Sequence, residues 1–209
     1  PALALASACL LFAPGARGQG EGVPVVNSSL TAPLFYQLLI GEIELREGAA
    51  GTAYEVVLDA ARKTGEEQLF RRATDIALQA RAGDQALTAV QAWRAALPGS
   101  LEAHRYQVQL LVALNRIAET AEPLRSLIGL TPPGEQAGLI TASPRLYARA
   151  SDRRAAAAAL DAALASYAAA PATATAARVA MGRGWLLAQD RVRALDLAQA
   201  AHRADPLAE

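Results

Sequence analysis

Side chains that could do chemistry are few and widely separated in this chain of 209 residues. The two histidines, His104 and His202, lie on distant parts of the sequence, and Cys9 is the only cysteine. A zinc site of the usual kind needs His and Cys ligands at short, regular spacings, which are missing. Glu42 and Glu44 would diverge on a helix and form no carboxylate pair. The sequence therefore predicts a non-catalytic protein that uses no metal or other cofactor.

Arginine carries nearly all of the positive charge, because Lys63 is the only lysine, and it is therefore the more promising functional group. The 20 basic residues balance 20 acidic ones, so no basic excess points to nucleic acid. The side chains that we expect on the concave face of the helical array described below, and that we predict to contact a partner, are Phe35, Glu42, Arg46, Phe70, Arg81, Arg105, Gln109, Arg145, Arg149 and Arg183. Their arginines predict a broken basic stripe that binds carboxylates of a partner protein. Solvated surface arginines are the alternative interpretation.

The composition predicts the elements that position these side chains. Hydrophobic residues make up 53% of the chain but aromatic residues only 5%, so alanine supplies much of the apolar content. Alanine is the best helix former and lets packed helices approach closely. The chain holds no long alternation of apolar and polar residues, as a sheet would require. We therefore expect an all-α protein.

A weak internal repeat sets the order of the helices. A small residue or Asn, usually followed by Asp, recurs between helical stretches, and we assign the repeat to Gly48-Ala49, Gly83-Asp84, Asn115-Arg116, Ser151-Asp152 and Gln189-Asp190. A period of about 34 residues with two helices per unit is typical of a helical solenoid. We predict a right-handed superhelical solenoid of about five antiparallel helix hairpins, with hairpins 1–3 over residues 30–130 and hairpins 4–5 over residues 131–209.

Individual residues mark the ends and the packing of these helices. Gly65 is a plausible left-handed residue after a helix, and Asp84 and Asp152 are plausible N-caps. Pro144 falls inside an expected helix and predicts a kink or a split near that point. Trp93 is expected to pack between the second and third hairpins.

The fifth unit has the spacing of a named repeat. The residues that carry it are Gly182, Trp185, Ala194, Ala198, Ala201 and Pro206. The first unit reproduces part of it at Gly41, Gly48, Ala53 and Ala60, although Glu44 stands where an aromatic residue is expected. Residues 30–209 therefore resemble tetratricopeptide repeats, in which small residues let two helices approach. Such arrays usually end in a polar capping helix. Since none follows Pro206, we predict that the array is truncated here.

The N-terminal residues predict export. Residues 1–18, an apolar run followed by a Pro-Gly break, resemble part of a secretory signal peptide, and residues 19–29 resemble a flexible leader. Cleavage before Gln19 would release the chain, whereas a loose lipobox before Cys9 would lipidate it; a core helix over 1–12 is a third interpretation. We predict a periplasmic protein that is associated with the outer membrane only if Cys9 is lipidated.

Three segments, 30–48, 58–87 and 106–119, are similar to large proteobacterial periplasmic or outer-membrane tetratricopeptide proteins. That family includes the lipoprotein partner of a carboxyl-terminal processing protease. The resemblance implies a scaffold that binds this protease and presents peptidoglycan hydrolases to it, of which this chain would be the N-terminal portion. A structural envelope module that binds a glycan or a polysaccharide-export component is the alternative function.

Overall fold

The computed structural model describes residues 31–206 and is all-α over that range. Residues 1–30 and 207–209 lie outside the described residues, and with them Cys9, the expected signal peptide over 1–18 and the expected leader over 19–29. The elements are α1 (Ala32–Arg46), α2 (Ala50–Thr64), α3 (Glu67–Gln79), α4 (Gly83–Ala96), α5 (Leu101–Ala113), η1 (Ile117–Thr120), α6 (Ala121–Leu130), α7 (Pro133–Ala142), η2 (Ser143–Tyr147), α8 (Arg153–Ala169), α9 (Ala174–Leu187) and α10 (Arg191–Ala204).

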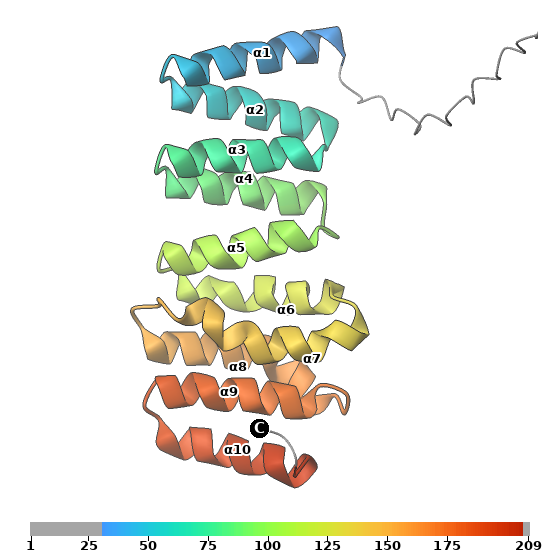
Figure 1. Ribbon diagram of the computed structural model, residues 1–209, viewed down its shortest axis with the longest axis vertical. Helices are drawn as coiled ribbons and strands as arrows, with labels where there is room; N and C mark the ends of the chain where they lie inside the picture. The colour runs from blue at the N-terminus through green and yellow to red at the C-terminus, as the bar shows by residue number, and fades with distance from the viewer. Residues whose placement is uncertain (1–30, 207–209) are drawn as a thin grey trace, which may run out of the picture.

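The helices form a single stack of antiparallel hairpins. Figure 1 shows α1 at one end of the stack, α10 at the other, and each hairpin lying on the one before it. Sequential helices pack on each other from α1 to α6, and α8, α9 and α10 continue the series. The predicted all-α solenoid is confirmed, and its repeat length and stacking fit a tetratricopeptide-type protein.

Four hairpin turns share one backbone motif. Gly48, Arg81, Asn115 and Gln189 all adopt left-handed conformations, with φ of 89°, 59°, 58° and 63°. In each turn the following residue donates its N–H to a carbonyl five residues earlier, at 2.8–3.0 Å. This pattern closes the C-terminal end of a helix by satisfying its last carbonyls. The first three turns are 33 and 34 residues apart, which is a more regular repeat than the sequence suggested.

The second turn lies two residues earlier than the sequence predicted. It lies at Arg81-Ala82, and Gly83, which we expected in the turn, is the first residue of α4. Asp84 is consequently inside the helix, and its side chain caps nothing. Gly83 instead leaves room for a neighbouring side chain: a Cβ there would lie 2.7 Å from Cδ2 of Leu114, which would have to shift.

We expect the left-handed turns to respond to substitution in opposite directions. Gly48→Ala should lower the free energy of unfolding by on the order of 1 kcal/mol, because alanine is strained at this φ. Arg81→Gly should raise it by up to about 1 kcal/mol, because a non-glycine residue is strained at the same kind of position. Urea unfolding followed by circular dichroism measures both changes. A loss of stability in Arg81→Gly would contradict the assigned turn.

Other boundary predictions are confirmed. Gly65 has φ of 70° and closes α2, and the Asp152 carboxylate accepts N–H groups from the first turn of α8. Trp93 is fully buried and its ring lies 5.8 Å from that of Tyr106 on α5, so it packs between the second and third hairpins.

The fourth hairpin is irregular, as Pro144 predicted. The α-helix ends at Ala142 and continues as the 3-10 helix η2, because proline cannot donate an N–H within a helix. Contacts also differ here from the other units: α7 packs mainly on α9, whereas α8 packs on η1, α6 and α9.

The positions expected to hold the repeats together are mostly in close contact. Ala53, Ala60, Trp185, Ala194 and Ala201 are buried. A Cβ at Gly41 would lie 3.1 Å from Val56, and one at Gly182 would lie 3.5 Å from the Ala194 carbonyl, so both glycines allow two helices to approach. Gly48 serves the turn rather than packing, and Pro206 is exposed, so these two expectations fail. Ala198 is exposed as well, although its backbone nitrogen lies 3.9 Å from the position of a Cβ at Gly182.

The buried residues form two main cores that meet within α5. The first core extends from Ala53 to Leu111, and the second begins at Val108 and continues to Ala180. Helix α5 therefore supplies apolar side chains to both. A cluster of polar side chains occupies this junction, on the side where α4 and α6 approach α5.

Candidate functional site

The predicted concave-face residues are mostly exposed. Those with solvent-exposed side chains are Phe35, Arg46, Arg81, Arg105, Gln109, Arg145, Arg149 and Arg183. Two of the arginines come together, because Arg145 on η2 and Arg183 on α9 line one pocket of about 470 Å³. The basic stripe that binds carboxylates stays a prediction.

Two members of the predicted set are engaged within the chain. Phe70 is wholly buried in the first core, so its assignment to a binding face is wrong. The error came from aligning Gly48 with Gly83, which pairs Phe70 with the exposed Phe35. Aligning Gly48 with Arg81 instead pairs Phe70 with Gln37, which is half-buried. Glu42 accepts two hydrogen bonds from Arg72, which hold the pKa of its carboxyl below the ordinary value.

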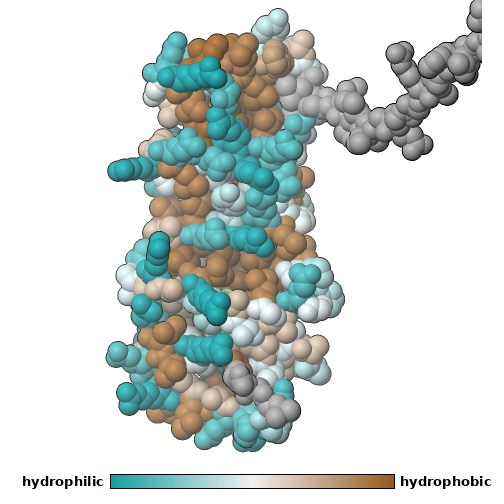
Figure 2. Space-filling model, in the orientation of Figure 1, coloured by the Kyte–Doolittle hydropathy of each residue, from teal (hydrophilic) through white to brown (hydrophobic). Residues whose placement is uncertain are grey.

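Helix α1 exposes an apolar face at the end of the stack, visible over α1 in Figure 2. The side chains that form it are Phe35, Tyr36, Leu39, Ile40 and Ile43, each between 46% and 63% exposed. In the repeat register, Ile40 and Ile43 correspond to Ala73 and Ile76 of α3, which are buried. The face is therefore of the kind that packs on a neighbouring helix in later repeats.

The most developed site is a pocket between α4, α5 and α6, of about 580 Å³. We call it the α4–α6 pocket. Its lining residues are Gln91, Arg94 and Ala95 of α4, Pro98 of the following loop, His104 and Gln107 of α5, and Ser126, Gly129 and Leu130 of α6. It therefore combines an apolar rim with polar groups, a composition typical of binding sites.

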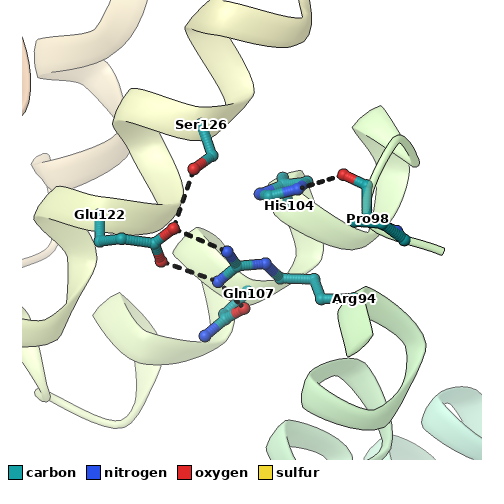
Figure 3. Close-up of polar contacts among 6 residues, drawn as sticks. All are labelled: Arg94, Pro98, His104, Gln107, Glu122 and Ser126. Atoms are coloured by element: carbon teal, nitrogen blue, oxygen red, sulfur yellow. Dashed lines mark hydrogen bonds and ion pairs between the residues drawn. The ribbon is translucent and has the colours of Figure 1, made fainter. Parts of the chain in front are cut away.

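Arg94, which lines the pocket, reaches from α4 to Glu122 on α6 (Figure 3). Its two terminal nitrogens donate to both carboxylate oxygens of Glu122, at 3.0 and 2.9 Å, and one also donates to Oε1 of Gln107 at 2.6 Å. Ser126 donates its hydroxyl to the same carboxylate at 2.9 Å. Glu122 thus balances the charge of Arg94, and the network fixes the guanidinium in one orientation.

His104 lies on the opposite side of Arg94 from Gln107 (Figure 3) and is 3% exposed. Its Nε2 is 3.0 Å from the Pro98 carbonyl. Because a carbonyl can only accept, Nε2 carries the proton in the neutral ring and Nδ1 is left as an acceptor. Neither His104 Nδ1 nor Arg94 Nε has a hydrogen-bond partner within residues 31–206, although both atoms are buried.

The repeat register shows that these polar groups replace core residues. With Arg81 aligned to Asn115, His104 and Gln107 occupy the positions of Phe70 and Ala73, which are entirely buried and apolar. Burying unpaired polar atoms is costly, and such departures from a consistent core are expected at functional sites. Sequence reasoning missed this pocket because it considered His104 only as a metal ligand. Comparison of the repeats in the correct register would have found it.

We expect the Arg94–Glu122 pair to make a small, pH-dependent contribution to stability. The hydrogen bonds from Arg94 hold the pKa of Glu122 below its ordinary value of 4.5. The pair therefore stabilises the folded state fully above that value, and this contribution is lost as the pH falls through the lowered pKa. Because the Glu122 side chain is 60% exposed, Glu122→Gln should cost less than about 1 kcal/mol at neutral pH.

Urea unfolding of wild type and Glu122→Gln over a series of pH values measures this contribution. The difference between the two proteins should vanish in acid. A difference that stays constant at every pH would show that the Glu122 charge does not carry the effect.

The described residues form no metal-binding cluster. No three His, Cys, Asp or Glu side chains among residues 31–206 are grouped so that they could hold a metal ion. His104 and His202 lie on α5 and α10. In the same range, no helix combines the length and apolar character needed to span a bilayer.

We compared the chain with protein families, curated proteins and solved structures. No protein-family model matches the chain, and no curated protein matches it in sequence. Among solved structures, the crystal structure of MamA protein is similar, with 11% sequence identity and a TM-score of 0.44. The match covers 83% of this chain and 92% of that one.

Proposed function

We propose that this chain is a non-catalytic scaffold that binds other proteins, and that a segment of the partner occupies the α4–α6 pocket. The observation that carries the proposal is the replacement of Phe70 and Ala73 by His104 and Gln107 in the next repeat. Two buried polar side chains at core positions lower the stability of the stack. A role in binding would explain why the chain carries them there. Stacked helical repeats create extended surfaces of the kind used for protein binding.

The pocket favours a neutral segment over a charged one. Glu122 already neutralises Arg94, so a carboxylate entering the pocket would compete with a fixed ion pair. The exposed rim residues Gln91 and Leu130 lie on different helices, α4 and α6, and could contact both sides of an inserted side chain.

The cellular setting extends the proposal. We place the scaffold in the periplasm, with outer-membrane association if Cys9 is lipidated, on the composition of residues 1–18. The segments 30–48, 58–87 and 106–119 support the narrower role of an adaptor between a carboxyl-terminal processing protease and peptidoglycan hydrolases.

Binding of the full chain to purified processing protease and to purified peptidoglycan hydrolases tests this role. Wild type should bind at least one of them, and His104→Phe should bind it more weakly. Val192→Ala is a matched control, because Val192 is exposed on α10, away from the pocket. Equal binding by wild type and His104→Phe would remove the pocket from the proposal, and binding to neither class would remove the adaptor role.

A further inference from the structure

The exposed apolar side chains of the described residues gather at the two ends of the stack. They are Phe35, Tyr36, Leu39, Ile40 and Ile43 on α1, and Leu186, Leu187, Val192 and Leu195 on α9 and α10. Figure 1 shows α1 and α10 at opposite ends. Over residues 31–206, only Leu78 and Leu130 are exposed large hydrophobic side chains elsewhere. Contiguous exposed apolar surface marks a site of association.

The exposed face of α1 is the one that receives the preceding helix in the next repeat. Ile40 and Ile43 are exposed, whereas their equivalents on α3, Ala73 and Ile76, are buried. Helix α3 packs on α4 just as α1 packs on α2, but α3 also packs on α2. Because α1 has no such second neighbour among the described helices, the missing preceding helix accounts for its exposed face.

Helix α10 presents the matching surface at the other end. With Gln189 aligned to Gly48, Leu195 occupies the position of Tyr54 on α2. Tyr54 is buried, and its hydroxyl donates to the Gln85 carbonyl on α4 at 2.8 Å, so this position contacts the next hairpin. Leu195 is 57% exposed, and within residues 31–206 no helix follows α10. Helix α10 therefore exposes the side that α2 uses to cover its successor.

The charges of these two ends are opposite. The charged side chains are Glu42, Glu44, Arg46 and Glu47 over residues 32–47, and Arg191, Arg193, Asp196 and Arg203 over α10. Helices α2 and α3 run antiparallel, so the same arrangement between α10 and α1 brings Arg191 to the end of α1 that carries Glu44 and Glu47. Such complementarity favours α10 over a second α1 as the occupant of the α1 face.

We propose that α10 of one copy packs on α1 of a second copy of this chain, as α2 packs on α3 within it. The contact joins two different surfaces, so a pair still has one open α1 face and one open α10 face. Association therefore continues head to tail and does not stop at a dimer. The α4–α6 pocket lies between these ends, so this proposal is independent of the proposed partner binding.

Sedimentation velocity of the full chain at increasing concentrations tests the proposal. Wild type should form species larger than a dimer. Ile40→Asp and Leu195→Asp should each weaken association by about tenfold or more, because each places a charge in an apolar contact. Leu78→Asp is the matched control: Leu78 is also exposed but lies on α3, so this variant should associate like wild type. Circular dichroism checks that every variant is folded.

A mixture of the two end variants distinguishes this contact from other modes of association. Ile40→Asp keeps an intact α10 and Leu195→Asp keeps an intact α1, so together they should form a one-to-one dimer that does not extend. A wild type that stays monomeric would overturn the proposal. So would a mixture that forms no dimer, or association that Ile40→Asp abolishes and Leu195→Asp leaves unchanged, as expected for two α1 faces in contact. Partner binding by the end variants would show that the scaffold function stands without self-association.

Discussion

Trp93→Ala is expected to lower the free energy of unfolding by about 3–5 kcal/mol, the usual cost of removing a large aromatic side chain from a packed core. Trp93 is among the largest fully buried side chains in the described part of the chain. Trp93 on α4 contacts Tyr106 on α5, so Trp93→Ala would leave a cavity between the second and third hairpins. A solenoid depends on such contacts between neighbouring repeats.

Urea unfolding followed by circular dichroism measures this loss, because tryptophan fluorescence would then report only Trp185. Trp93→Phe is the matched control. It keeps a ring in the core and removes an indole N–H that has no hydrogen-bond partner in the described structure, so its cost should be much smaller. A loss below about 1 kcal/mol in Trp93→Ala would show that the two hairpins are not held together at this point.

The double substitution His104→Phe with Gln107→Ala is expected to stabilise the fold and abolish partner binding. It gives α5 the residues that α3 has at the same register, Phe70 and Ala73. Removing a buried acceptor without a partner favours the folded state, and the loss of the hydrogen bonds to the Pro98 carbonyl and from Arg94 offsets part of this gain, so the free energy of unfolding should rise by up to about 1 kcal/mol. Arg94 keeps both of its hydrogen bonds to Glu122, so the charge pair survives.

Two measurements on each variant separate these effects: urea unfolding, and binding to whichever of the purified candidate partners wild type binds. Opposite changes, with stability rising and binding falling, are what a functional pocket requires. A fall in stability would show instead that His104 and Gln107 hold α5 in place. Glu122→Gln serves as a control that changes the network while leaving His104 intact.

Much of the fold could be predicted because its signals are local. Gly65 and Asp152 end and begin helices through the conformation and hydrogen bonds of single residues, and both predictions are confirmed. Pro144 likewise predicted the split fourth unit. Arg81 shows the limit of such signals: arginine does not ordinarily indicate a left-handed turn, so the nearby Gly83 was taken instead.

That two-residue error explains why Phe70 was misplaced and why the pocket was missed. Register determines which side chains of successive repeats are equivalent, and only the left-handed residues of the structure establish it. Once Arg81 is aligned with Gly48 and Asn115, the buried Phe70 and the polar His104 are equivalent positions. The pocket itself depends on the spacing of α4 and α6, which no local pattern encodes.

Site-specific photocrosslinking tests the central claim most directly. A photoreactive amino acid would replace Gln91, an exposed residue at the rim of the α4–α6 pocket, and the full chain would be irradiated in an extract of the source cells. We expect one discrete protein adduct, identified by mass spectrometry, that is absent when the probe is placed at Val192 and lost in the His104→Phe, Gln107→Ala background. An adduct that survives the double substitution, or none at Gln91, would contradict the assignment of this pocket as the protein-binding site.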